Sequence, residues 1–483
     1  MTKKQVRQTK IVATLGPATA GEAAMRGIVD AGVDVVRLNL SHGSADDHST
    51  NAATLRAAAR EAGRVVGVLC DLQGPKIRVE AFRDGPVALE SGDAFFLDPT
   101  LGAEDGTAEG VGVGYAGLPD DVAAGDILLL ADGLIRLRVT GIEGRRIHTR
   151  VEVGGTLSAR KGINRLGGGL SVRALTDKDR RDIELAARLD ADYLAVSFPR
   201  DGHDIDEARE LLRRAGGEAG IVAKIERREA LESLESIMDS ADAVMIARGD
   251  LAVEIGHAEL PGVQKRIMRL ARRRECVVIT ATQMMQSMVD SPVPTRAEVL
   301  DVANAVIDGT DAVMLSDETA VGHYPVETVT AMSEVCVGAE HSSDDGPLDP
   351  DAHALSTPCR RIDETIAKTA IDAANRLDVG AIAAMTESGA TVMWMSRLST
   401  RIPIFALSEH ERTRGRVTLY RGVHPVSFDP TVPGRDVLDG EAVGQLLEIG
   451  AVTEGELVII TKGDRAGERG GTNTLKIVPA ARR

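Results

Sequence analysis

Short apolar runs separated by helical spacers recur along most of the chain. These runs lie at residues 10–15, 33–40, 65–72, 193–198, 221–225, 243–247, 277–280 and 312–316. A continuous apolar run of this length is typical of a strand buried on both faces, as in a parallel sheet. Eight such strands alternating with helices of similar length predict an α/β fold, a closed (β/α)8 TIM barrel.

The pattern changes twice along the chain. From residue 79 to 173 helical periodicity disappears, and short alternating runs are punctuated by Gly and Asp, which predicts an inserted antiparallel β domain. Residues 340–358 are rich in Ser, Asp, Pro and Gly and predict a linker. Beyond the linker we expect helices at 362–377 and 391–398 and strands at 380–385, 403–407, 423–426, 457–461 and 474–478.

These patterns divide the chain into four segments. We expect the first part of the barrel at 1–78, a β-rich lid domain at 79–173, the second part of the barrel at 174–345, and a C-terminal α/β domain at 346–483. A length of 483 residues agrees with this division, because it suits roughly three domains.

Polar residues follow seven of the eight apolar runs of the barrel. They are Arg37, Asn39 and Ser41; Asp71; Ser197; Lys224 and Glu226; Arg248 and Asp250; Thr282; and Ser316 and Glu318. One such ending is explained by a surface ion pair, but the recurrence favours a shared site, since barrels place their chemistry at the carboxyl ends of the strands. Two carboxylates and a lysine on neighbouring runs suggest a divalent metal beside an anionic substrate.

Composition narrows the classes of partner. Lys and Arg number 57 against 73 Asp and Glu, a net charge of −16, which argues against nucleic acid or an anionic membrane as the main partner. The four cysteines show no CxxC spacing and are expected to be reduced, buried residues. The first residues lack the apolar core of a signal peptide and no run approaches membrane length, so we expect a cytoplasmic protein.

Seven motifs resemble pyruvate kinase, in order and over nearly the whole chain. They lie at 9–19, 37–43 (Arg-Leu-Asn-Leu-Ser-His-Gly), 71–78, 223–226, 247–254 (Ala-Arg-Gly-Asp-Leu-Ala-Val-Glu), 280–288 and 314–320. Residues 421–426 and 470–478 look like the bacterial branch called pyruvate kinase II. The resemblance implies a lid inserted after the third barrel strand and a C-terminal regulatory domain. It also implies a glycolytic phosphotransferase that moves the phosphoryl group of phosphoenolpyruvate to ADP, giving pyruvate and ATP.

The resemblance also implies roles for the residues at the strand ends. Glu226 and Asp250 would hold Mg²⁺ or Mn²⁺, Lys224 would lie beside the transferring phosphoryl group, and Arg37 would grip phosphate oxygens. The backbone N–H groups of Gly249 and Asp250 would receive the substrate carboxylate. A bound dication supplies several kcal/mol of charge stabilisation and a helix N-terminus about 0.3–1 kcal/mol, so the metal ligands should matter more than the turn.

Two further sets of residues follow from the resemblance. Thr282 would lie near the substrate's methylene carbon, with a water chain through Thr282 and Ser316 delivering the proton; a hydroxyl bonded only to backbone is the alternative. Candidate nucleotide contacts are Asn39, His42, Arg78 and Lys161. Residues 165–169 depart from the family's usual sequence, which leaves the shape of this loop open.

A monovalent-ion site is implied at Asn39, Ser41 and Asp71 with the carbonyl of Leu72. Lys76 stands where potassium-dependent members carry glutamate. An ammonium about 4 Å from a carboxylate contributes roughly 4 kcal/mol at an effective dielectric near 20, so we predict that K⁺ is dispensable. The alternative is a solvated Lys76 beside an occupied K⁺ site.

The C-terminal domain carries a predicted effector site. The loop contains Thr386, Ser388, Gly389 and Thr391, with Arg465 and Arg469 positioned to close over it. Hydroxyls and a glycine at a helix N-terminus form a phosphate cradle, which suggests a sugar phosphate or a nucleoside monophosphate as activator. An ordinary helix cap is the alternative. By resemblance we also expect a homotetramer.

Two other functions compete with the kinase. A metal-dependent lyase or aldolase acting on a pyruvate enolate would share the carboxylate pair, but it leaves the lid and the basic segment around Lys161 unexplained. A non-catalytic metabolite sensor would keep the fold without turnover. The presence of Lys224, Glu226, Asp250 and Thr282 together argues against the sensor.

Overall fold

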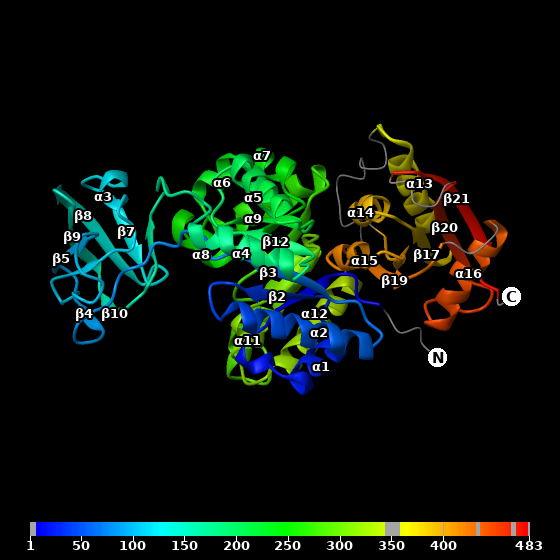
Figure 1. The fold of residues 1–483 in the computed structure, drawn as a ribbon, viewed down its shortest axis with the longest axis horizontal. Helices are drawn as coiled ribbons and strands as arrows, with labels where there is room; N and C mark the ends of the chain where they lie inside the picture. Colours follow the sequence, from blue (N-terminus) through cyan, green and yellow to red (C-terminus); the bar gives the residue numbers. More distant parts are fainter. Residues whose placement is uncertain (1–5, 343–357, 399, 431–434, 465–469, 482–483) are drawn as a thin grey trace.

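The computed structural model describes residues 6–342, 358–398, 400–430, 435–464 and 470–481. Three parts lie in a row, with the barrel between the inserted domain and the C-terminal domain (Figure 1). In the described residues no helix is both long enough and apolar enough to cross a bilayer.

The central part is a closed parallel barrel, as the sequence predicts. Its strands are β1 (Lys10–Thr14), β2 (Val35–Asn39), β3 (Gly67–Asp71), β12 (Tyr193–Val196), β13 (Gly220–Ile225), β14 (Ala243–Ala247), β15 (Val277–Ala281) and β16 (Ala312–Leu315). Each strand pairs with its neighbours in chain order, and β3 pairs with β12 across the insertion. Burial on both faces explains why these strands read as continuous apolar runs.

Helices surround the barrel. They are α1 (Glu22–Ala31), α2 (Ala45–Glu61), α4 (Asp177–Arg188), α5 (Gly202–Arg214), α6 (Arg228–Glu232), α7 (Leu234–Ser240), α8 (Arg248–Ile255), α9 (Leu260–Arg273), α10 (Arg296–Ile307), α11 (Asp317–Ala320) and α12 (Pro325–Ser342). The sequence places the second helix at 51–62, but α2 begins at Ala45. Ser44 and Asp47 form a capping box there, which satisfies the first N–H groups and extends the helix.

The inserted domain is built on a six-stranded sheet in the order β11-β7-β8-β9-β5-β6. The strands are β5 (Ala94–Asp98), β6 (Gly110–Gly112), β7 (Ile127–Leu130), β8 (Ile135–Glu143), β9 (Arg146–Val153) and β11 (Ile163–Arg165); β4 (Val87–Leu89) pairs with β10 (Gly155–Leu157), and α3 spans Leu118–Asp121. The expectation of an antiparallel domain needs one correction. β5 and β6 pair in parallel, because the residues between them return the chain to the edge of the sheet in the same direction.

The C-terminal domain is a sheet in the order β19-β18-β17-β20-β21, with only β21 antiparallel. Its elements are α13 (Ile362–Arg376), β17 (Val379–Met385), α14 (Ala390–Arg397), β18 (Ile404–Ser408), α15 (Glu411–Val417), β19 (Val423–Ser427), α16 (Arg435–Glu448), β20 (Leu457–Gly463) and β21 (Thr472–Pro479). The apolar pattern does not predict α15 and α16. The linker prediction is wrong at its start, because residues 340–342 continue α12; residues 343–357 lie outside the described part.

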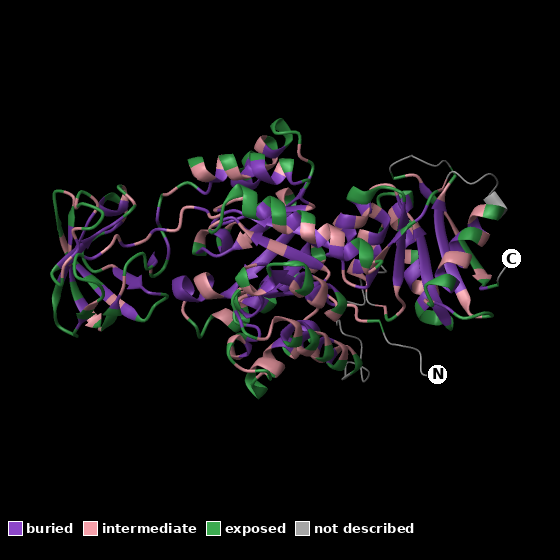
Figure 2. Cartoon of the chain, turned by 60° about the horizontal axis from the view of Figure 1, so that its bottom comes forward, coloured by how far each residue is buried: buried purple, intermediate pink, exposed green. Residues whose placement is uncertain are grey.

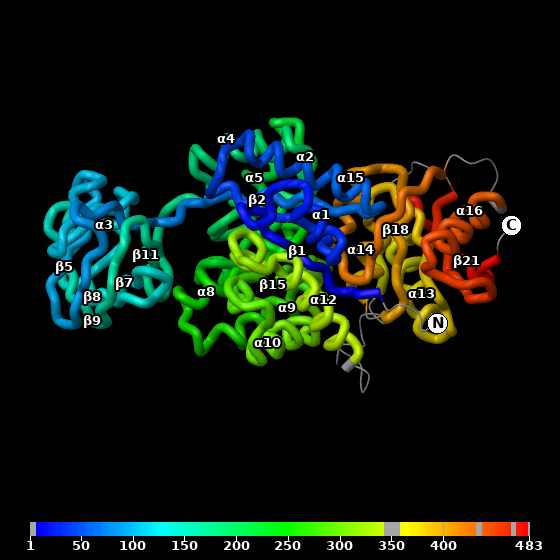
Figure 3. The backbone as a smooth tube through the Cα atoms, turned by 90° about the horizontal axis from the view of Figure 1, so that it is seen from below, coloured from blue at the N-terminus to red at the C-terminus, as the bar shows by residue number. Residues whose placement is uncertain are grey.

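One of the buried apolar clusters extends from the barrel interior into the C-terminal domain, and both parts are rich in buried residues (Figure 2). The interior of the barrel, including Val12 and Tyr193, is continuous with residues of α13 and α14 such as Ile371 and Val392. Lys10 Nζ donates to the carbonyl of Val423 at 2.6 Å across the same junction. The C-terminal domain therefore covers the amino ends of the barrel strands. The lid domain lies on the opposite side of the barrel (Figure 3), and its Asp132 lies 4.0 Å from Lys76 in the loop after β3.

Candidate active site at the carboxyl ends of the barrel strands

Lys224, at the end of β13, lies at the centre of a buried polar cluster. Its ammonium donates to Ser197 Oγ at 2.7 Å and lies 3.0 Å from Glu226 Oε1 and 3.3 Å from Asp71 Oδ1. Burial acts to lower the pKa of Lys224, but the two carboxylates outweigh it and raise that pKa above its ordinary value. The side chain therefore presents a permanent positive charge at this end of the barrel.

Arg37 is held against the same cluster. Its Nε donates to Asp71 Oδ2 at 2.7 Å, and its Nη1 donates to Thr14 Oγ1 at 3.1 Å. Burial acts to raise the pKa of Asp71, but Lys224 and Arg37 lower it below the usual range. Two cations thus share one buried, ionised carboxylate. The pairing of β2 with β3 sets Asn39 beside Asp71, as the predicted ion site requires.

Glu226 is the more buried of the two predicted ligands of the divalent cation, at 2% exposure. Its Oε2 accepts the backbone N–H of Phe198 at 2.8 Å. Phe198 adopts a positive φ of 55°, which directs that N–H inward. Burial raises the pKa of Glu226, and the negative charges of Asp250 and Asp71 raise it further, against the opposing effect of Lys224. Hard carboxylate oxygens that repel one another fit a divalent cation.

Asp250 lies in the first turn of α8, which begins at Arg248. Its Oδ1 is 2.8 Å from the ammonium of Lys76, which comes from the loop after β3. Lys76 also lies 4.0 Å from Asp132 of the lid domain. The ammonium therefore already balances charge at a predicted metal ligand. Its substitution for K⁺ stays a prediction, because its ion pairs are with Asp250 and Asp132 rather than with Asp71.

Thr282 is fixed by backbone contacts at the end of β15. Its hydroxyl donates to the carbonyl of Ala281 at 2.6 Å and accepts the N–H of Gly249 at 2.9 Å, and its φ is +68°. Arg248 donates to the carbonyl of Thr282 at 2.8 Å and supports this conformation. These bonds fit the alternative in which the Thr282 hydroxyl is bonded only to the backbone. Between the described Thr282 and Ser316 hydroxyls there is no hydrogen bond, so the water chain stays a prediction.

The predicted nucleotide residues occupy two places. Arg78 and Lys161 lie where the lid domain joins the barrel: Arg78 pairs with Gly162, and its Nη1 donates to the carbonyl of Arg160 at 2.9 Å. Asn39 and His42 lie at the end of β2 and in the turn after it, where Asn39 Oδ1 accepts the N–H of Ser41 at 3.2 Å. Lys161 and His42 are exposed, as a contact with a nucleotide that binds and leaves requires.

Ser197 follows an apolar run in the sequence, and the structure adds it to the site. Its hydroxyl accepts from Lys224 and donates to the carbonyl of Leu72 at 2.7 Å, so it orients the lysine. Leu72 is the residue whose carbonyl was expected to ligate K⁺. In the sequence, only its position at the end of an apolar run indicates that Ser197 belongs to the site.

The expectation about the cysteines needs one correction. Cys70, Cys276 and Cys336 are buried, but Cys359 is only half-buried. Cys359 lies just before α13, at the start of the C-terminal domain. Its burial depends on tertiary packing that the sequence does not show. All four are free thiols, as expected.

Glu254, at the end of α8, links this helix to α6 and to the lid domain. Its Oε2 accepts the N–H of Arg228 at 2.8 Å, and its carbonyl accepts the N–H of Gly167 from the lid domain at 3.1 Å. Burial raises the pKa of Glu254 to about 7, and nearby Glu229 adds to this effect. The folded protein therefore holds this proton more tightly than the unfolded chain, whose Glu pKa is about 4.3. The free energy of unfolding should fall as pH rises from the unfolded pKa through the folded one.

We therefore expect Glu254→Gln to raise the free energy of unfolding by about 2 kcal/mol at pH 8 and by little at pH 5. An amide keeps the acceptor for Arg228 and removes the buried charge. Urea unfolding of both proteins at the two pH values measures the difference. Equal differences at pH 5 and pH 8 would contradict the assignment.

The predicted effector loop joins β17 to α14. Gly389 has φ +83° and donates its N–H to Thr386 Oγ1 at 3.0 Å, while Thr391 Oγ1 bonds Thr472 Oγ1 at 2.9 Å. The direction of chain progression across the sheet reverses between β17 and β20, and ligands of open α/β sheets bind at such a switch point. Arg465 and Arg469 lie outside the described residues.

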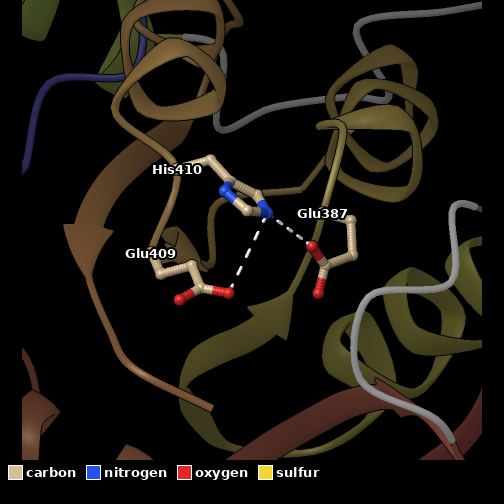
Figure 4. Close-up of side chains that lie close together, drawn as sticks. All are labelled: Glu387, Glu409 and His410. Atoms are coloured by element: carbon tan, nitrogen blue, oxygen red, sulfur yellow. Dashed lines mark hydrogen bonds and ion pairs between the residues drawn. The ribbon is translucent and has the colours of Figure 1, made fainter. Parts of the chain in front are cut away.

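One carboxylate of this loop does not suit a phosphate. Glu387, in the middle of the loop, lies 2.7 Å from His410 Nε2, and Glu409 approaches the same nitrogen at 4.0 Å (Figure 4). The loop therefore combines hydroxyls and N–H groups that favour phosphate with a negative side chain that opposes it.

Comparison with known proteins agrees with this geometry. The family described as "Pyruvate kinase, barrel domain" matches residues 6–329, and "Pyruvate kinase, alpha/beta domain" matches 364–478. The chain is 52% identical to "Pyruvate kinase II" of Salmonella typhimurium over 98% of this chain and 99% of the relative. It is 49% identical to "Pyruvate kinase" of Haemophilus influenzae, covering 95% and 96%, and 40% identical to "Pyruvate kinase" of Mycobacterium tuberculosis, covering 98% of each.

Proposed function

Because this chain belongs to the pyruvate kinase family and transfers the phosphoryl group of phosphoenolpyruvate to ADP, we propose that Glu226 and Asp250 hold its divalent cation. The observation that carries this assignment is that Glu226 follows β13 and Asp250 follows the neighbouring strand β14, with the Lys224 ammonium 3.0 Å from Glu226 Oε1. When bound, Mg²⁺ or Mn²⁺ polarises phosphoryl oxygens as a Lewis acid. The relatives give no support to the lyase or sensor functions.

Phosphoryl transfer depends mainly on positioning and charge neutralisation. We assign Lys224 to the transferring group, because its ammonium is held permanently charged at the end of β13. Arg37 has its Nε and Nη1 engaged by Asp71 and Thr14, which fixes the guanidinium plane for contact with phosphate oxygens. Ser197 limits the rotamers of Lys224, so less conformational freedom is lost when substrate binds.

The first turn of α8 is assigned to the substrate carboxylate. Helix N-terminal N–H groups attract anions, and a glycine lets the substrate approach the backbone closely. Around Gly249 the nearest atoms that an added Cβ would meet are those of Thr282, at 3.8 Å. The Gly249 N–H is bonded to the Thr282 hydroxyl, so binding here would release that hydroxyl toward the substrate. This exchange would let Thr282 order water for protonation of the enolate.

We expect comparable turnover with and without K⁺. Lys76 places an ammonium 2.8 Å from Asp250. This positive charge is covalently attached to the protein, so it can take over the electrostatic role of a bound ion. Steady-state assays in tetramethylammonium buffer measure this directly. Strict dependence on K⁺ would rule out the electrostatic substitution.

Lys76→Met serves as the matched variant for this assay. It keeps most of the length of the side chain and removes its charge, so turnover in K⁺-free buffer should fall about tenfold or more. Lys265→Met, which removes an exposed lysine on α9, is the control. Equal activity of Lys76→Met and wild type without K⁺ would show that the ammonium has no such role.

A phosphorylated effector is proposed for the loop at 386–391. Its position at the switch point and its hydroxyl and N–H groups support a sugar phosphate or a nucleoside monophosphate. We expect Glu387→Gln to bind such an activator about fivefold more tightly, because one negative charge is removed near the phosphate. Activation measured at low phosphoenolpyruvate, over a panel of these metabolites, provides the test.

The control for that experiment is Glu409→Gln, which changes a more exposed carboxylate beside the same histidine. No response of the wild type to any phosphorylated metabolite would count against the site. Weaker activation of Glu387→Gln would contradict the charge argument alone.

We also propose a homotetramer. Leu300 and Ile307, seven positions apart on α10, are 64% and 42% exposed. Residues at this spacing lie on one face of a helix, and an exposed apolar face is one that a second subunit would cover. Light scattering of the purified protein would identify the oligomer. A monomer at micromolar concentration would contradict this proposal.

A further inference from the structure

A cavity lies between the barrel and the C-terminal domain. Its volume is about 790 Å³, and its lining includes residues of α9 and α12 from the barrel and of α13 and α14 from the C-terminal domain, two parts that adjoin in Figure 1. Ligand sites have volumes of about 300–1,000 Å³ and occur often at domain interfaces. The cavity lies at the amino ends of the barrel strands, far from the catalytic cluster at their carboxyl ends.

The cavity is also separate from the effector loop. It contacts Ile404 at the start of β18 and Gly422 just before β19, which are amino ends of strands in the C-terminal sheet. The effector loop follows the carboxyl end of β17. The cavity and the effector loop therefore lie at opposite ends of the strands of one sheet.

Arg421 is the residue of this cavity that indicates a ligand. Its Nη1 donates to the carbonyls of Thr310 at 3.0 Å and Val306 at 3.2 Å. Among the described residues no carboxylate forms an ion pair with its guanidinium. Burial lowers the pKa of Arg421, although Glu340 and Asp311 act in the other direction. Arg421 is half-buried at the cavity, and a guanidinium there without a carboxylate partner offers its remaining N–H groups to an anion.

The two carboxylates that line the cavity are engaged elsewhere. Asp311 accepts from Arg397 Nη1 at 2.8 Å and from the N–H of Val278 at 2.8 Å. Glu340 accepts the backbone N–H groups of Thr9 at 2.7 Å and Gln8 at 3.1 Å. Asp311 is therefore engaged across the junction and Glu340 within the barrel part, and neither forms an ion pair with Arg421.

The rest of the lining is rich in arginine, and one of these arginines, Arg397, is paired with Asp311. Arg272, Arg397, Arg401 and Arg421 line it against Asp311 and Glu340, and Asn375, Ser396 and Thr400 add groups able to bond hydroxyls. Planar guanidinium donors match the oxygens of a phosphate group, and neutral polar groups match a sugar or polyol. We propose that this cavity binds a phosphorylated small molecule of about monosaccharide size, at a site distinct from the effector loop.

Binding of such a ligand can affect the catalytic end of the barrel through β16. Thr310 and Asp311 immediately precede β16, and Arg421 contacts the first of them. The opposite end of β16 leads into Ser316 and the Glu318 carboxylate that accepts its N–H. Binding that favours one position of the C-terminal domain would therefore shift the position of β16. We expect the ligand to change the half-saturating concentration of phosphoenolpyruvate.

The test uses the full-length protein with glycerol 3-phosphate, inorganic phosphate and succinate as probes, followed by calorimetry and thermal unfolding. We expect saturable binding of glycerol 3-phosphate to wild type. Binding should be at least tenfold weaker in Arg401→Gln and Arg421→Gln. It should be unchanged in Arg376→Gln, which alters an exposed arginine of α13 outside the cavity, and in Ser388→Ala, which alters the effector loop.

Arg401 is exposed, so its variant tests the proposal even where Arg421→Gln fails to fold. Affinity unaffected in both cavity variants would overturn the proposal, as would tight binding of succinate with no binding of either phosphate probe. Loss of binding in Ser388→Ala alone would assign the phosphate to the effector loop and would also overturn it.

Discussion

The Glu226→Gln variant is expected to lose about 10³-fold or more in kcat while folding at least as stably as the wild type. The loss follows from the several kcal/mol that a bound dication contributes, since about 1.4 kcal/mol corresponds to tenfold in rate. Stability should not fall, because burial and the charges of Asp250 and Asp71 already raise the pKa of Glu226, and a neutral amide relieves that repulsion. The amide oxygen can still accept from Phe198.

Turnover over a range of Mg²⁺ and Mn²⁺ concentrations, together with urea unfolding, separates these two effects. The control is Glu232→Gln, which neutralises an exposed carboxylate on the neighbouring helix α6. Near-normal turnover of Glu226→Gln at any metal concentration would reject its assignment as a ligand. A large loss of stability would instead show that the carboxylate has a structural role.

The Lys224→Met variant is expected to lose both turnover and stability. Removing the ammonium leaves Asp71 and Glu226 without their shared cation. Breaking a buried ion pair costs about 3–5 kcal/mol. Arg37 still pairs with Asp71, so the lower part of this range is expected. The rate should fall by about 10³-fold or more, because a charge near the transferring phosphoryl group is lost.

The double variant Lys224→Met, Glu226→Gln tests whether the two losses have different causes. Neutralising Glu226 should restore part of the stability lost in Lys224→Met and none of the activity. Lys265→Met, which removes a lysine from an exposed ion pair, should change stability by less than about 1 kcal/mol. A Lys224→Met protein that turns over normally would remove the lysine from the mechanism.

Prediction from the chain succeeded where the information is local. Eight apolar runs correspond to eight barrel strands, because a strand buried on both faces needs uninterrupted apolar residues. The capping box at Ser44 and the helix α15 were missed although their signals are also local, since short polar helices carry little periodicity. In the inserted domain the strand runs were found, but the parallel pairing of β5 and β6 was not.

The partners of the site residues could not be read from the chain. Lys76 and Asp250 are 174 residues apart, and the motif at Lys76 gives no sign that this aspartate, rather than Asp71, receives its ammonium. The positive φ of Phe198 and the bond from its N–H to Glu226 likewise depend on two loops meeting. Arg421 is one more arginine in the sequence and becomes distinctive only because no described carboxylate pairs with it.

The chain alone therefore determined the barrel, the order of its strands and the family of the site, because side-chain periodicity and residue type at strand ends are properties of consecutive residues. Tertiary structure alone decided which charges compensate each other, which hydroxyls are already bonded and where a cation is left facing a cavity. Those outcomes are set by distances of a few ångströms between segments far apart in the chain, and electrostatic energies depend on such distances and on burial.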